Sequence, residues 1–214
     1  MRYLIVCGGK IDKEFRLNEI KADGIDAIIA ADSGMDFLYE NGVTPDIIVG
    51  DFDSATTKAL EFFERKGQTE IHRLNPIKDD TDTEYAIRLA IREGARSIVV
   101  LGATGSRIDH VLGNISLLGI GLESKTDISI IDTNNRIRMA DKPVTIEKSA
   151  QYGRFVSLIA VTDDNEVSLK GFKYPVTDYS FDRFTSLGIS NEIVDDHALI
   201  DIHRGKFIII ESKD

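Results

Sequence analysis

The chain has 214 residues, of which 42% are hydrophobic, and a formal net charge of −10. This length and composition predict a folded globular protein with a substantial hydrophobic core, in one large domain or two smaller ones. The acidic balance argues against general binding to nucleic acid or to an anionic membrane, but a nucleotide ligand stays open because a divalent cation can join carboxylates to phosphates.

Continuous apolar runs in the first half of the chain predict four strands, over residues 2–7, 26–31, 46–50 and 97–102. Such runs are typical of strands that are buried on both faces of a parallel sheet. Capping and stop residues between them predict helices over 33–42, 54–67, 81–94 and 109–123. The expected N-caps are Ser33, Ser54 and Thr81, the last with Glu84 in capping-box spacing. This alternation predicts a doubly wound α/β domain over 1–125, with a mostly parallel sheet and helices on both faces.

From residue 126 the pattern changes to short strands separated by turn residues, with little helical periodicity. A spacing of roughly 8 to 12 residues between such strands is typical of antiparallel sandwiches and barrels. We therefore expect a C-terminal antiparallel β-sandwich over 126–214. The predicted strands are 127–133, 135–140, 154–161, 166–172, 198–205 and 206–212.

Cys7 is the single cysteine, so an intrachain disulfide is impossible. It ends the apolar run 2–7, and we expect a buried, unreactive thiol there. No apolar stretch approaches the roughly 20 residues that a membrane-spanning helix needs. We therefore expect no membrane association and a cytoplasmic location.

Carboxylates gather where the predicted strands end. Asp32 follows one strand, Asp51 and Asp53 follow the next, and Asp82 belongs to the acidic run "DDTD" before a helix. Ligands of open α/β sheets bind at this edge, and residues two apart in an extended segment point the same way. Any one of these aspartates could instead be a helix cap or a turn residue. Together they favour a metal–phosphate site, and an all-oxygen set favours Mg²⁺.

The stretch "LGATGSRIDH", residues 101–110, contains the residues of an anion-binding turn. Gly102, Gly105 and Ser106 allow a tight turn whose backbone N–H groups can approach a phosphate. Arg107, and Lys78 directly before the acidic run, offer cationic groups for phosphate oxygens. The chain contains neither a Walker phosphate loop nor a GxGxxG dinucleotide motif.

Six motifs in order resemble those of the thiamine pyrophosphokinase family. They are "ADSG" (31–34), "PDIIVGDFDS" (45–54), "DDTDTEYA" (79–86), "GATGSRIDHVLGN" (102–114), "GFKYPV" (171–176) and "LGISNE" (187–192). The resemblance implies transfer of the terminal diphosphate of ATP to the hydroxyl of thiamine, with Mg²⁺, giving thiamine diphosphate and AMP. It also implies an N-terminal catalytic domain, and a C-terminal β-sandwich that binds thiamine and dimerises. The active sites of the homodimer would form between subunits.

The resemblance further implies a role for each matching residue. The metal ligands would be Asp51, Asp53 and Asp82, with Asp32 beside them in the catalytic set. The ATP site would be lined by Asp79, Thr104, Gly105, Ser106, Arg107 and Asp109, and thiamine would be bound by Ser190 and Asn191. The chain has no tryptophan, which some relatives stack on thiamine, so an aromatic stack here would need Phe181, Phe184 or Tyr179.

Two alternative functions stay open. One is a pyrophosphokinase for a pterin alcohol, with the same ATP and Mg²⁺ half of the site. The other is a non-catalytic sensor of nucleotide or thiamine. Release of AMP from ATP only when thiamine is added would distinguish the expected enzyme from both.

Overall fold

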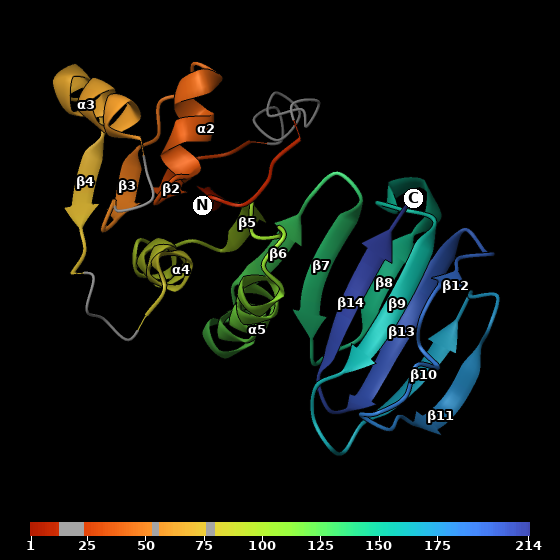
Figure 1. Cartoon of the computed structure of the whole chain (residues 1–214). Helices are drawn as coiled ribbons and strands as arrows, with labels where there is room; N and C mark the ends of the chain where they lie inside the picture. The colour runs from red at the N-terminus through yellow and green to blue at the C-terminus, as the bar shows by residue number, and fades with distance from the viewer. Residues whose placement is uncertain (13–23, 53–55, 76–79) are drawn as a thin grey trace. The chain divides into compact units, whose positions relative to one another are not determined.

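The computed structural model describes residues 1–12, 24–52, 56–75 and 80–214 (Figure 1). The chain divides into two compact units, Met1–Thr133 and Asn134–Asp214. None of the helices in the described ranges has the length and apolar character required to cross a membrane.

The first unit is built on a parallel sheet in the order β6-β5-β1-β2-β3-β4. Every neighbouring pair in this order is parallel. The chain adds strands on one side of β1 as far as β4 and then returns to the other side of β1, so the strand order reverses there. The strands are β1 (Arg2–Val6), β2 (Ala27–Ala31), β3 (Ile47–Gly50), β4 (Glu70–Arg73), β5 (Ser97–Leu101) and β6 (Asp127–Ile131).

Helices cover both faces of this sheet, α2 and α3 on one and α4 and α5 on the other (Figure 1). Leu4 and Val6 of β1 pack into one core cluster with Leu38 of α2 and Phe63 of α3, and Ile5 between them is also fully buried. Burial of consecutive residues explains the continuous apolar runs and confirms the predicted doubly wound α/β fold. The helices are α2 (Gly34–Glu40), α3 (Thr57–Lys66), α4 (Asp82–Arg92) and α5 (Ile108–Ser124).

The predicted helix starts have different outcomes. Thr81 has extended backbone, and its Oγ1 accepts a hydrogen bond from the N–H of Glu84 at 3.2 Å, so this cap is confirmed. Ser33 precedes α2 but its side chain does not cap the helix, because its backbone is already helical (φ −63°, ψ −4°). Ser54 lies outside the described residues, and α3 begins at Thr57 with Thr56 at the N-cap position.

Two strands of the first unit differ from the prediction. The edge strand β4 was not predicted, because Ile71 is the only apolar residue of "EIHR". The segment from 127 was assigned to the antiparallel half, but β6 pairs parallel with β5 and extends the first sheet. The structural division therefore falls between Thr133 and Asn134 and not at 125/126.

The second unit is an antiparallel β-sandwich, as predicted. One sheet has the order β12-β9-β14-β7 and the other β11-β10-β13-β8. The core between them includes Leu158 and Phe207 from the first sheet and Leu169 and Ile200 from the second. Strands β8, β11 and β12 were not predicted. The bounds are β7 (Asn135–Ala140), β8 (Val144–Glu147), β9 (Phe155–Ala160), β10 (Glu166–Lys170), β11 (Val176–Ser180), β12 (Asn191–Glu192), β13 (His197–Arg204) and β14 (Phe207–Ser212), with a short 3-10 helix at Lys148–Ala150.

Candidate active site

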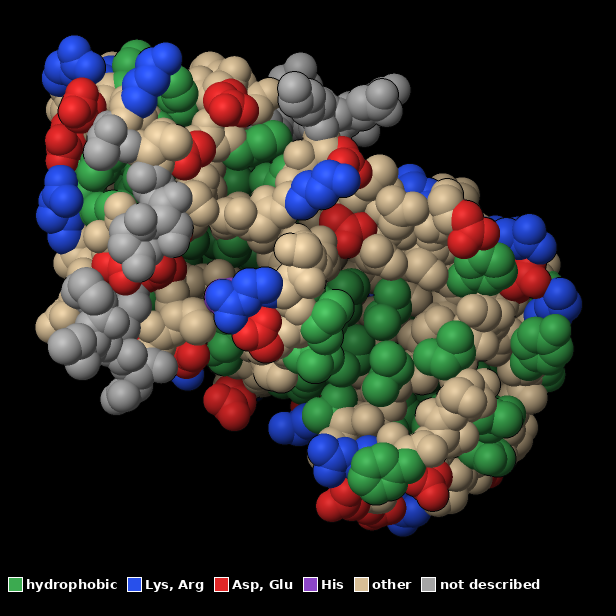
Figure 2. Space-filling view, viewed as in Figure 1, with side chains coloured by type: hydrophobic (Ala, Val, Ile, Leu, Met, Phe, Trp, Pro, Cys, Tyr) green, Lys and Arg blue, Asp and Glu red, His purple; other side chains and the backbone are tan. Residues whose placement is uncertain are grey.

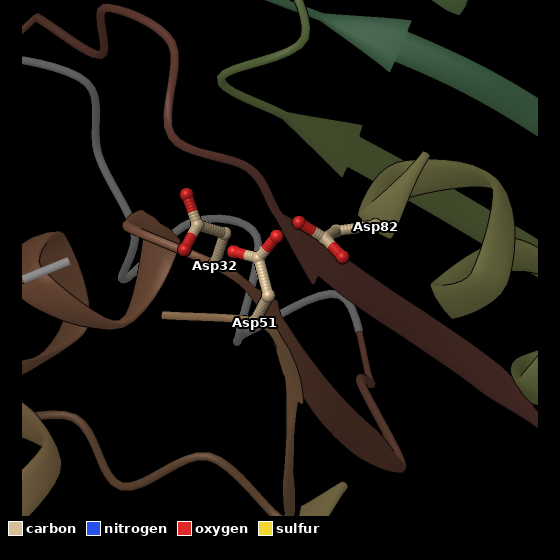
Figure 3. A group of neighbouring side chains, drawn as sticks. All are labelled: Asp32, Asp51 and Asp82. Carbon is tan, nitrogen blue, oxygen red and sulfur yellow. The ribbon is translucent and has the colours of Figure 1, made fainter. Parts of the chain in front are cut away.

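Three aspartates converge at the carboxyl edge of the parallel sheet. Asp32 follows β2, Asp51 follows β3, and Asp82 is the first residue of α4. Their side chains lie beside one another (Figure 3), and one carboxylate oxygen from each lies within 4.8 Å of the others. All three side chains are half-buried. The sequence-based expectation that separate acidic segments meet in space is confirmed for these three residues.

The backbone turns sharply where two of these aspartates leave the sheet. Asp32 has a φ of +48° and Phe52, directly after Asp51, has a φ of +65°. Residues other than glycine rarely adopt this left-handed region, and such residues often occur at functional sites. The N–H of Asp32 donates to the carbonyl of Val49 at 2.8 Å, which ties the turn after β2 to the end of β3.

Asp82 is placed by the start of α4. The Thr81 cap fixes this helix end, and the helix dipole directs partial positive charge toward an anionic group there. The next residue, Thr83, donates from its hydroxyl to Sγ of Cys7 at 3.4 Å. Burial, together with the nearby charge of Asp82, raises the pKa of the Cys7 thiol to about 11. The prediction of a buried thiol is confirmed.

The electrostatics of this cluster favour a bound cation. Three carboxylates within 4.8 Å repel one another when all are ionised. A hard divalent cation relieves this repulsion and prefers carboxylate oxygens as ligands. Asp53, the expected fourth member, lies outside the described residues, as do Lys78 and Asp79.

The predicted anion-binding loop lies at the same edge, between β5 and α5. Gly9 donates from its N–H to the carbonyl of Gly102 at 2.8 Å. A Cβ atom added to Gly9 would lie 2.3 Å from the carbonyl oxygen of Gly102. A Cβ atom added to Gly102 would lie 2.3 Å from the carbonyl oxygen of Cys7. Glycine is therefore required at both positions for the loops after β1 and β5 to approach each other. Gly105 and Ser106, further along the loop, are exposed.

Arg107 and Asp109 form an ion pair at the start of α5. The Nη2–Oδ2 distance is 2.6 Å, and about two-thirds of each side chain is exposed (68% and 66%). The hydrogen bond from Arg107 holds the pKa of the Asp109 carboxyl below its usual value, and the same bond raises the pKa of Arg107. An exposed pair of this kind contributes little to stability, and both side chains can be reached from solvent.

Ser190 and Asn191 lie in the second unit, at the start of β12. Ser190 is exposed with a φ of +61°, and its N–H donates to Oγ of Ser157 at 2.9 Å. Asn191 is buried, and its amide bonds to both backbone groups of Tyr174, accepting at 3.0 Å and donating at 2.9 Å. Its Oδ1 also accepts from the N–H of Glu192 at 3.0 Å. Asn191 therefore joins the two motifs "GFKYPV" and "LGISNE".

The three aromatic candidates for stacking on a ligand have different environments. Phe181 is 3% exposed and packs edge-on against Phe207 in the sandwich core, with 5.6 Å between ring centroids. It is therefore excluded as a stacking partner. Tyr179 and Phe184 are 40% and 92% exposed.

Asp132 belongs to the same edge of the sheet, and the sequence analysis missed it. It follows β6 and accepts a hydrogen bond from Oγ1 of Thr104 at 2.9 Å. Asp32 was identified because ligands of open α/β sheets bind at the carboxyl ends of the parallel strands. The same argument applies to Asp132, but only if β6 is assigned to the parallel sheet.

The site combines clustered carboxylates with a glycine-containing loop, where the strand order of a doubly wound sheet reverses. Such sites are typical of enzymes that act on phosphorylated substrates. This class agrees with the comparisons to known proteins. The thiamin pyrophosphokinase catalytic domain matches residues 21–131. The vitamin B1 binding domain of the same enzymes matches residues 143–207.

Individual relatives agree over nearly the whole chain. The chain is 35% identical over 188 residues to thiamine pyrophosphokinase of Bacillus subtilis (strain 168), covering 87% of each. The crystal structure of thiamine pyrophosphokinase from Bacillus subtilis superposes with a TM-score of 0.89 at 30% identity, covering 100% of both chains. That of thiamin pyrophosphokinase from Geobacillus thermodenitrificans gives 0.85 at 30% identity, covering 100% of this chain and 98% of that one. The chain belongs to the thiamin pyrophosphokinase family, and the enzyme class implied by its motifs is confirmed.

Proposed function

We propose that this enzyme transfers the terminal diphosphate of ATP to the hydroxyl of thiamine in a Mg²⁺-dependent reaction. The observation that carries the proposal is the convergence of Asp32, Asp51 and Asp82 in a chain that matches the catalytic domain of the family. The match to the vitamin B1 binding domain favours thiamine over a pterin alcohol as acceptor.

The carboxylate cluster fits a magnesium ion. Carboxylate oxygens are the ligands that Mg²⁺ prefers, and the cluster offers one from each of three residues within 4.8 Å of one another. Mg²⁺ usually keeps several waters, so three protein ligands leave room for phosphate oxygens. Asp32, Asp51 and Asp82 would hold the ion, with Asp53 as a further ligand. When bound, Mg²⁺ would offset the negative charge of the phosphates.

The residues of the chain would act by positioning and by charge. In an in-line displacement, the hydroxyl oxygen of thiamine bonds to the β-phosphorus while the bond from that phosphorus to AMP breaks. The hydroxyl proton would pass to a carboxylate of the site, Asp53 or Asp82. Reactions of this type depend mainly on alignment and charge neutralisation. Arg107 would reach the phosphates together with Lys78, and Asp79 and Asp109 would line the nucleotide site. Thr104, Gly105 and Ser106 would contribute through the loop backbone.

Thiamine would be bound by Ser190 and Asn191. Ser190 is exposed, so a ligand can reach its hydroxyl. The side-chain amide of Asn191 has two N–H donors: one is donated to the carbonyl of Tyr174, and the other would bind thiamine. Tyr179 and Phe184 are the exposed aromatic candidates for stacking on the thiamine rings.

A homodimer is supported by the outward face of the β12-β9-β14-β7 sheet. Met139, Ile208 and Ile159 form one row across it, and Figure 2 shows hydrophobic side chains gathered where Figure 1 draws β7 and β14. Ile159 is 39% exposed on this outward face. The opposite face of the same sheet packs into the sandwich core. Apolar patches of this kind mark interaction surfaces. The next row contains Ser157, the anchor of Ser190, so thiamine binding and dimerisation would use neighbouring residues.

The decisive experiment measures AMP release from ATP with and without thiamine and Mg²⁺. We expect AMP only when both are present, together with an equal amount of thiamine diphosphate. A pterin-specific enzyme would need a pterin alcohol in place of thiamine, and a sensor would bind without releasing AMP. Either result would overturn the proposal.

Mixing two impaired variants, assayed at thiamine concentrations well below the raised KM of the second, tests whether the active sites lie between subunits. Asp51→Asn removes a metal ligand of the first unit, and Ser190→Ala removes a thiamine ligand of the second. If each site uses both subunits, mixed dimers contain one intact site, and random pairing restores about a quarter of wild-type activity. If each site is built within one subunit, mixing restores nothing. Analytical ultracentrifugation of the wild type measures the oligomeric state directly.

A further inference from the structure

The loops that follow three neighbouring strands are joined by side-chain hydrogen bonds. Thr104, after β5, donates to Asp132, after β6, at 2.9 Å. Thr133 in turn donates to Asp12, in the segment after β1, at 2.7 Å. Because β1, β5 and β6 are adjacent and parallel, these loops leave the same edge of the sheet.

The base of the predicted nucleotide loop is held by three separate contacts. The carbonyl of Gly102 accepts from the N–H of Gly9 at 2.8 Å, and that of Ala103 accepts from the side chain of Asn114 at 2.8 Å. The third contact is the bond from Thr104 to Asp132. Beyond these points, the residues from 105 to 107 are exposed. The loop therefore has a fixed base and an accessible tip.

The bond to Asp132 also limits what Thr104 can do. A threonine hydroxyl has one proton, and here it is donated to a carboxylate. A phosphate needs donors, so Thr104 would serve the nucleotide through its backbone N–H and through the position of the loop. That position depends on an acceptor at residue 132.

We propose that Asp132 is a positioning residue for the nucleotide: through Thr104 it holds the segment from 104 to 107 in the conformation that receives ATP. A loop ordered before binding gives higher affinity than one that must be ordered on binding. The inference rests on the proposed function, because it names a residue that serves the same ATP site.

The test compares the Michaelis constants for ATP and for thiamine in Thr104→Val and Asp132→Ala. Each change removes the same hydrogen bond, and we expect the KM for ATP to rise roughly tenfold, as for loss of one charge-assisted bond. The KM for thiamine should stay within about twofold. Because both changes break the same hydrogen bond, Thr104→Val should add little to the effect of Asp132→Ala in the double variant. Thr104→Ser keeps the hydroxyl and should restore the wild-type value.

Asp127→Ala is the matched control, since Asp127 is exposed at the opposite end of β6. It should leave both constants unchanged. An unchanged KM for ATP in Thr104→Val, additive effects in the double variant, or equal increases for both substrates would overturn the inference. If Asp132→Ala does not fold, Thr104→Val and Thr104→Ser decide alone. A wild-type enzyme that releases no AMP would refute the proposed function instead.

Discussion

Replacing Asp51 with asparagine should abolish catalysis without weakening the fold. The change keeps the size of the side chain but removes one of three charges that lie within 4.8 Å of one another. If Asp51 holds the metal, the rate of AMP release should fall on the order of 100- to 1000-fold, the size of effect seen when one preorganised charge-stabilising group is lost. A purely structural role predicts a loss of stability instead.

The effect on stability can be estimated from the geometry of the cluster. At 4.8 Å, two carboxylates repel by about 0.9 kcal/mol in a water-like medium and by about 3.5 kcal/mol at an effective dielectric constant of 20. The side chains are half-buried and in contact with solvent, so the lower figure applies. Asp51→Asn relieves two such repulsions, which in this solvent-screened limit amount to about 2 kcal/mol. Without metal, the melting temperature should therefore rise by roughly 4 to 8 °C.

The assay combines activity with thermal unfolding. AMP release is measured over a range of Mg²⁺ concentrations, and melting is measured at low ionic strength in chelator and in Mg²⁺. Wild type should be stabilised by Mg²⁺, whereas Asp51→Asn should melt higher in chelator and gain less from the ion. Asp127→Asn, at the exposed start of β6, should change neither property. Near-normal turnover in Asp51→Asn, or a fall in its melting temperature in chelator, would refute the metal-site interpretation.

Three further predictions concern other parts of the structure. Thr81→Ala should cost about 1 kcal/mol of unfolding free energy in urea titrations through loss of the α4 cap, whereas Thr81→Ser should retain it; equal losses would contradict the cap. Burial raises the pKa of Cys7, so its thiol ionises more easily in the unfolded chain than in the folded protein. The unfolding free energy of wild type should therefore fall more than that of Cys7→Ala as the pH rises from 9 to 11. A difference in unfolding free energy that stays constant over this range would argue against this. Asn191→Ala should raise the KM for thiamine and leave that for ATP unchanged, because its contacts lie within the sandwich; a selective effect on ATP would exclude this role.

The elements with strong local patterns were predictable from sequence. Continuous apolar runs such as residues 2–7 correspond to strands in which several consecutive residues are buried, and the cap at Thr81 follows from chemistry within one helical turn. Short polar strands such as β4 carry no such pattern, because an edge strand is stabilised by pairing with its neighbour and needs few apolar side chains.

Asp32 and Asp51 were identified from sequence because strand ends in a parallel sheet share one edge, which is a property of the fold class, and Asp82 because it belongs to an acidic run before a helix. The sequence did not identify Asp132, although the same rule applies to it. The local pattern of the segment "DISII" does not distinguish a parallel from an antiparallel neighbour, and the structure pairs it in parallel with β5. Local patterning thus determined which residues form strands and helices and which carboxylates were candidates. The tertiary structure decided which strands are neighbours, and with them which side chains meet, because hydrogen bonds between strands join residues far apart in the chain.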